Sequence, residues 1–130
     1  MNSFLTSRLH KGVITFEVTG SSPSESEWEM SKILIDNWYQ YIEFWNIKVG
    51  LLFLLSNLVY IKPKFLLEWK DIFNSKREKT RKYIKGSAIV VENVFIRSFV
   101  NTFFKAFKSE KPVKFVKSEK EGIEFINSLK

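Results

Sequence analysis

Few side chains in this sequence have the types and spacing that catalysis requires. The only histidine, His10, stands beside Lys11 near the start of the chain, so a Ser-His-acid triad would depend on this one residue. The chain has no cysteine, which excludes thiol catalysis, a disulfide scaffold and any thiolate-bound metal or iron–sulfur cluster. The five glycines are isolated, so no glycine-rich phosphate loop is present. These residues predict a protein that is not an enzyme and uses no metal or cofactor.

Three carboxylates of the central part of the chain stand among basic residues. Glu68, Asp71 and Glu78 lie on a predicted helix, and Glu78 is spaced to pair with Arg81 or Lys82 one turn further on. A catalytic pair of carboxylates needs surroundings that drive the two pKa values apart. The local sequence supplies no such difference, so we interpret these carboxylates as part of a solvated helix face.

Basic residues form a more suggestive pattern on the same predicted helix. They are Lys62, Lys64, Lys70, Arg77, Arg81 and Lys85. In one continuous helix the last four would fall within an arc of about 80°, which predicts a cationic ridge. Such a ridge could contact a polyanion, an anionic membrane surface or an acidic protein. No aromatic residue is interleaved with these cations and no nucleic-acid motif is present, which argues against nucleic acid as the partner.

Length and composition indicate one domain spanning residues 1–130. The chain is 15.4 kDa with 45% hydrophobic and 27% charged residues, values that are typical of a globular protein. The net charge of +7 is uneven, because residues 1–61 carry −2 and residues 62–130 carry +9. No linker marks the change, so we predict a single domain with a polarised surface.

The longest apolar run extends from Val49 to Ile61 and contains Ser56 and Asn57. It is too short for a membrane-spanning helix, which needs about 20 apolar residues. The first residues also lack the apolar region and cleavage site of a secretory signal. We therefore expect a cytoplasmic location.

Apolar periodicity predicts an α/β fold with a mixed sheet of four or five strands and about four helices, in the order β(β)αβαβαβα. The expected strands are 3–9, 12–18, 47–55, 87–92 and 112–117, and the expected helices are 25–45, 62–85, 94–108 and 119–129. A capping box of Ser24 with Glu27, or of Ser26 with Glu29, would start the first helix. Asn93 and Ser118 are predicted to start the last two.

Aromatic residues make up 16% of the chain, a large share for one small core. Trp69 and five phenylalanines of the third helix have the spacing of a core face, and they could also line a cavity for an apolar ligand. These phenylalanines are Phe95, Phe99, Phe103, Phe104 and Phe107. A second set, Tyr39, Tyr41, Trp45 and Phe107, is expected at the margin of the core as an exposed patch, which makes a homodimer through helices a reasonable hypothesis.

Three segments resemble the STAS domain family in its broad SpoIIAA-like sense. Leu54-Leu55-Ser56-Asn57-Leu58-Val59-Tyr60-Ile61 is similar to the strand-to-loop segment of that family, which has the form Asp-x-Ser-x-hydrophobic. The other two are Gly86-Ser-Ala-Ile-Val-Val91, before a helix, and Pro112-Val-Lys-Phe-Val-Lys-Ser118, before a helix that contains Glu121. The resemblance covers about 85 residues, and the first 45 match by element order.

This resemblance implies a non-catalytic interaction module that has lost the usual phosphorylation switch. The phosphoacceptor position falls on Lys64, and the preceding aspartate of the family falls on Leu54. An unidentified protein is the expected partner, with the loop and basic helix as the expected contact surface: Ser56, Lys62, Lys64, Lys70, Arg77, Arg81 and Lys85. Two alternatives remain open, namely a carrier or sensor of a small apolar ligand or lipid under the third helix, and weak polyanion binding by the basic helix.

Overall fold

The computed structural model describes residues 4–106 and 111–129. Within these residues the chain forms five strands and five helices. In chain order they are β1 (Leu5–His10), β2 (Val13–Val18), α1 (Glu25–Trp45), β3 (Val49–Leu54), α2 (Pro63–Ser75), α3 (Arg77–Tyr83), β4 (Ile84–Val90), α4 (Val94–Ala106), β5 (Val113–Val116) and α5 (Glu119–Asn127).

The five strands form one mixed sheet in the order β1-β2-β3-β4-β5. β1 and β2 are antiparallel and joined by Lys11 and Gly12, whose positive φ angles of 48° and 78° suit the right-handed twist of a two-residue hairpin. The remaining neighbours pair in parallel, as helical crossovers require. The predicted α/β class is confirmed, and β5 forms one edge of the sheet.

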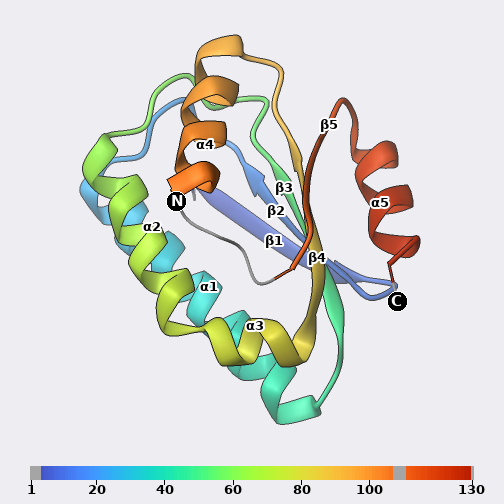
Figure 1. Ribbon diagram of the computed structural model, residues 1–130. Coiled ribbons are helices and arrows are strands. Elements are labelled where there is room, and N and C mark those ends of the chain that lie inside the picture. The colour runs from blue at the N-terminus through green and yellow to red at the C-terminus, as the bar shows by residue number, and fades with distance from the viewer. Residues whose placement is uncertain (1–3, 107–110, 130) are drawn as a thin grey trace.

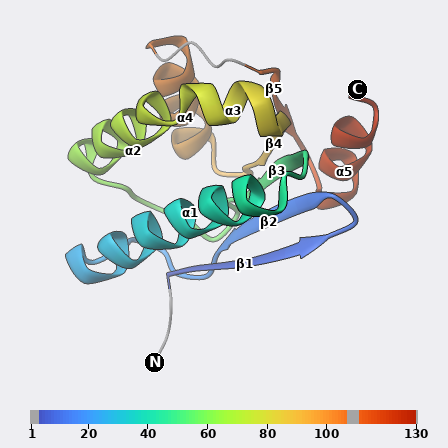
Figure 2. The same cartoon turned by 90° about the horizontal axis from the view of Figure 1, so that it is seen from below.

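The helices divide unequally between the two faces of the sheet (Figure 1). α1 to α4 cover one face, where alternate residues of β3 such as Leu51 and Phe53 point into the larger core. α5 lies on the opposite face and covers Leu52 and Ala88 through Ile126. The view in Figure 2, turned by 90°, shows α1, α2 and α3 side by side with α5 apart from them.

Local capping sets the starts of three helices as predicted. The Ser24 side chain accepts from the Glu27 amide at 3.2 Å, and the Glu27 carboxylate accepts from the Ser24 amide at 2.9 Å, which completes the capping box at α1. Asn93 Oδ1 accepts from two amides at the start of α4. Ser118 Oγ accepts from the Glu121 amide at 3.2 Å at the start of α5.

The prediction of one continuous helix from 62 to 85 is wrong. The helix breaks at Lys76, whose φ and ψ of −110° and 18° lie outside the helical region, and α3 ends at Tyr83. Lys85 and Gly86 therefore belong to β4, where strand pairing with β3 overrides the helical periodicity of the sequence. Gly86 is required there by close packing, since a Cβ atom would lie 2.9 Å from the Pro112 carbonyl oxygen.

Two expectations about aromatic residues are also corrected. The inward stripe of α4 is narrow and consists of Ile96, Val100 and Phe103, so Phe95 and Phe99 face outward. Tyr39, which was expected at the margin, is buried under α3. The side chain of Phe104, and Phe107 with the predicted end of that helix, lie outside the described residues.

Candidate functional site

An apolar cavity of about 70 Å³ lies between the sheet and the helices of the larger core. Its walls come from α1, α2 and α4 on one side and from β3 and β4 on the other. Trp69 and Phe103, which the sequence predicted for an apolar cavity, both line it, together with Phe53 and Ile89. This volume is several times that of a single bound water on the same scale, so the helices do not seal completely onto the sheet.

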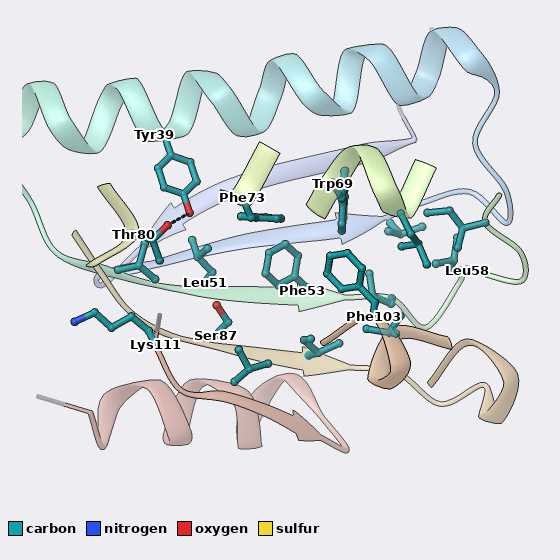
Figure 3. A pocket seen from close by; sticks show the side chains of 18 of the residues that line it. Tyr39, Leu51, Phe53, Leu58, Trp69, Phe73, Thr80, Ser87, Phe103 and Lys111 are labelled. Carbon is teal, nitrogen blue, oxygen red and sulfur yellow. Dashed lines mark hydrogen bonds between the residues drawn. The ribbon is translucent and has the colours of Figure 1, made fainter. Parts of the chain in front are cut away.

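The cavity differs in chemistry between its two ends (Figure 3). Leu58 and Phe103 lie near one end, and Thr80, Ser87 and Lys111 lie near the other. Arg77 is also part of the lining. An apolar passage with hydroxyl and cationic groups at one end is suited to an amphiphilic molecule with an anionic head.

Tyr39 is the buried polar group in this wall. Its hydroxyl and the Thr80 hydroxyl form a hydrogen bond of 2.9 Å. Burial raises the pKa of Tyr39 to about 12, and the hydrogen bond with Thr80 opposes part of that rise. The phenol therefore remains neutral across the physiological range.

Trp69 supplies a second polar group. Its ring contacts Trp28, Phe53 and Phe73, with ring centroids 5.2, 6.1 and 6.1 Å apart. Among the described residues its Nε1–H is buried without a hydrogen-bond partner. Such an unpaired donor costs about 1–3 kcal/mol, which makes the wall of the cavity more favourable to a ligand that brings an acceptor.

A separate exposed surface lies at the carboxyl ends of β3 and β4. The loop from β3 to α2 and the start of α4 both leave the sheet at this edge (Figure 1). Five apolar side chains in these segments and in the first turns of α2 are exposed, and together we call them the partner surface: Val59, Tyr60, Leu67, Val94 and Phe95. The largest exposure, 84%, is that of Phe95. Hydrogen bonds from the Val59 and Tyr60 amides to the Ser21 carbonyl, at 2.8 and 3.1 Å, hold the loop in place.

Lys62 and Lys64 stand between Tyr60 and Leu67 in the chain and therefore border the partner surface. Both ammonium groups approach the Glu25 carboxylate, at 3.8 and 3.3 Å, and both lie over the Phe65 ring. They remain largely exposed. Surface pairs of this kind contribute little stability, so the two lysines can exchange Glu25 for another carboxylate at small cost.

The other predicted surface residues are spread over the molecule. Ser56 lines a shallow hollow on the α5 side of the sheet, next to Glu17 and Glu92. Lys70 lies on α2, Arg77 and Arg81 lie on α3, and Lys85 lies in β4. Of the seven residues, the structure brings only Lys62 and Lys64 together beside the partner surface.

The sequence placed Val59 and Tyr60 in the loop that was expected to contact a partner, but it did not single out the other three residues of the partner surface, Leu67, Val94 and Phe95. Phe95 falls in a helix whose phenylalanines all have the spacing of a core face. Which of these side chains are exposed depends on how the helices pack on the sheet, and local periodicity does not determine that packing.

The remaining perturbed ionisable groups form ion pairs that join helices. Lys76 donates to Asp36 and lowers the pKa of that carboxyl group. Glu29 and Glu68 together raise the pKa of Lys32. Across residues 4–106 and 111–129, no three His, Cys, Asp or Glu side chains are grouped to hold a metal ion.

None of the described helices is long and apolar enough to cross a bilayer.

No protein-family model and no curated protein matches the sequence. Two solved structures are similar in fold. One is a protein of the DUF3478 family with a SpoIIAA-like fold from Shewanella loihica (TM-score 0.67, 10% identity, 94% of this chain and 91% of that one). The other is an anti-sigma factor antagonist from Mycobacterium paratuberculosis (TM-score 0.61, 10% identity, 95% and 92%). The chain therefore has a SpoIIAA-like fold of the STAS type.

Proposed function

We propose that this chain is a non-catalytic regulatory module that binds a protein through the partner surface. The observation that carries the proposal is the exposure of five apolar side chains at one edge of the sheet. Exposed apolar groups gathered at one place are typical of protein interfaces. One similar structure is described as an anti-sigma factor antagonist, which is a regulator of another protein.

The chemistry of the partner follows from the border of this surface. Lys62 and Lys64 lie beside Tyr60 and Leu67, so the complementary surface would be apolar and flanked by carboxylates. Lys64 occupies the phosphoacceptor position of the STAS resemblance. We therefore propose that phosphorylation at this position does not control binding.

Capture of binding proteins from the source cells, quantified by mass spectrometry, tests this proposal. Phe95→Glu should reduce the specific partner at least tenfold, since a central aromatic in an interface typically contributes more than about 1.4 kcal/mol. Phe44→Glu is the matched control, because Phe44 is similarly exposed (77%) but lies on α1, away from this edge. A protein captured equally by all three forms would not be a partner of this surface.

Two charge-reversal variants distinguish binding at the partner surface from binding at the basic residues of α3. Lys62→Glu with Lys64→Glu should weaken capture, and Arg77→Glu with Arg81→Glu should leave it unchanged, because those arginines lie on α3. The opposite result would place the contact on the basic residues of α3 and overturn the assignment to the partner surface.

The cavity favours a second candidate function, the binding of an apolar ligand as carrier or sensor. We propose a short fatty acid of about six carbons, which the volume of the cavity can hold, with its chain between Phe53 and Phe103 and its carboxylate toward Arg77 and Lys111. The same segments face both sites, because Leu58 lines the cavity while Val59 and Tyr60 point outward from the same loop. A bound chain would thus alter the shape of the partner surface.

Titration with hexanoate, followed by tryptophan fluorescence, tests the ligand site. We expect saturable quenching by hexanoate and about tenfold weaker binding in Arg77→Gln, while hexanol should bind both forms equally. Native mass spectrometry of the purified protein gives an independent readout. A native mass spectrum without bound ligand, together with a linear titration that does not saturate, would eliminate the ligand site as a candidate. This result would not affect the proposal that the partner surface binds a protein.

A further inference from the structure

α1 carries a second apolar stripe on the side that faces away from the sheet. The inward stripe contains Trp28, Ile35, Tyr39 and Ile42, all buried. At 100° per residue the opposite side contains the residues that we call the outer stripe: Met30, Ile33, Asn37, Tyr41 and Phe44. All five are exposed, and Trp45 extends the stripe at its end. A helix that is apolar on both sides is typically covered on both sides.

The outer stripe is symmetric about its central residue. The intervals from Met30 to Phe44 are three, four, four and three residues. If a second α1 is laid antiparallel with a twofold axis at Asn37, then Met30 lies opposite Phe44 and Ile33 lies opposite Tyr41. Asn37 meets Asn37 of the other copy, and each amide can both donate and accept in that pair. A central asparagine of this kind sets the register of paired helices.

The area of the stripe suits such a pair. The exposed fractions are 59% for Met30, 53% for Ile33, 42% for Tyr41, 77% for Phe44 and 59% for Trp45. With about 200 Å² per large side chain, these fractions amount to about 580 Å² per copy. Two copies would bury about 1,150 Å², which exceeds the threshold of about 1,000 Å² for a biological interface and lies just below the standard size of about 1,200–2,000 Å².

The acidic residues beside the outer stripe do not prevent two copies from approaching, because each is paired with a lysine of its own chain. Glu29, Asp36 and Glu43 follow one border at intervals of seven residues. Each has a lysine partner within the chain: Lys32 at 2.8 Å, Lys76, and Lys79 at 3.3 Å, respectively. The border is therefore neutralised and offers no attraction to anionic lipids, which favours a second copy over a membrane surface.

We propose that the protein forms a twofold-symmetric homodimer through antiparallel contact of the two α1 helices, centred on Asn37. The helix axes would be about 8–10 Å apart, which places the two Asn37 Cα atoms about 4–6 Å from each other. The dimer leaves both sites free, because the partner surface lies on other elements and the α1 residues that line the cavity, Trp28 and Tyr39, belong to the inward stripe.

The absence of cysteine in the chain permits a direct test by single-cysteine crosslinking. Under mild oxidation Asn37→Cys should form a dimer through a disulfide, since its Cα separation is suitable. Gln40→Cys, also exposed on α1, is the control and should not crosslink, because its own symmetry mate lies about 9 Å further along the axis. The register is tested by Met30→Cys with Phe44→Cys, which should crosslink as a pair, whereas each single variant should not.

Sedimentation of the unmodified chain supplies the second readout. We expect a mass of twice 15.4 kDa that falls to 15.4 kDa in Phe44→Asp, a substitution at an exposed site that leaves the fold intact. A monomer at all concentrations would overturn the proposal. Equal crosslinking of Asn37→Cys and Gln40→Cys would overturn the register, and a dimer that is lost in Phe95→Glu but retained in Phe44→Asp would move the contact to the partner surface.

Discussion

Replacing Trp28 with alanine is expected to lower the free energy of unfolding by about 3–5 kcal/mol. Trp28 is completely buried at the centre of an aromatic stack, with ring centroids 4.7 Å from Phe65 and 5.2 Å from Trp69. Its Nε1–H donates to Glu68 at 3.1 Å, so the substitution also removes a contact between α1 and α2. Denaturant unfolding followed by circular dichroism measures the change.

Trp28→Phe is the matched control for this prediction. It retains an aromatic ring against Phe65 and loses the hydrogen bond to Glu68, so the expected loss is about 1–2 kcal/mol. A small domain has about 5–15 kcal/mol of total stability, and the alanine variant should therefore unfold at a much lower denaturant concentration. A loss below about 1 kcal/mol in Trp28→Ala would contradict the tight packing of this stack.

The second large effect is a loss of stability at alkaline pH caused by Tyr39. In the folded protein the pKa of Tyr39 is raised to about 12 by burial, whereas an unfolded tyrosine ionises near 10. The contribution is therefore fully present below about pH 10 and is lost as the pH rises toward 12, because only the unfolded chain releases the proton readily. The expected loss across this window is about 2–3 kcal/mol.

Tyr39→Phe isolates this effect from the other groups that titrate in the same window. The variant should lose less stability than the native chain between pH 10 and 12, although it forfeits the hydrogen bond with Thr80 at neutral pH. The measurement is the free energy of unfolding in urea at several pH values for both forms. Parallel curves for the two proteins would show that Tyr39 does not carry the alkaline transition.

Much of the fold could be predicted because its signals are local. Ser24 and Glu27 are close in sequence and form their capping box within one turn. Ile14, Phe16 and Val18 alternate along β2 and all lie in the larger core. Signals of this kind depend only on neighbouring residues, so the first helix and the second strand have the expected bounds to within a residue or two.

The segment around Lys76 could not be predicted from local signals. Its residues favour helix on both sides, and the break arises where the chain must turn to place Ile84 beside Val49 in the sheet. The same tertiary pairing moves Lys85 from a helix into a strand and removes it from the predicted ridge. Helical periodicity reflects only neighbouring residues, so it cannot predict a break that is caused by pairing between strands far apart in the chain.

The sites are harder to predict than the elements for the same reason. The cavity is formed by side chains from eight elements, β2 to β5 and α1 to α4, and these side chains include Tyr39, Phe53, Trp69, Ile89 and Phe103. Trp69 and Phe103 could be named in advance as apolar lining, but the buried Tyr39 could not, because its position depends on how α1 packs against α3.

The order of the strands bears on how the protein is made. Their spatial order is their order in the chain, so no strand has to be inserted between two strands that are already paired. A chain leaving the ribosome can complete the β1–β2 hairpin first and then extend the sheet at a single edge. α5 follows all five strands in the chain and covers the apolar face around Leu52 and Ala88. That face of the nascent sheet stays open to solvent until α5 has left the ribosome, and the docking of α5 then protects it from aggregation.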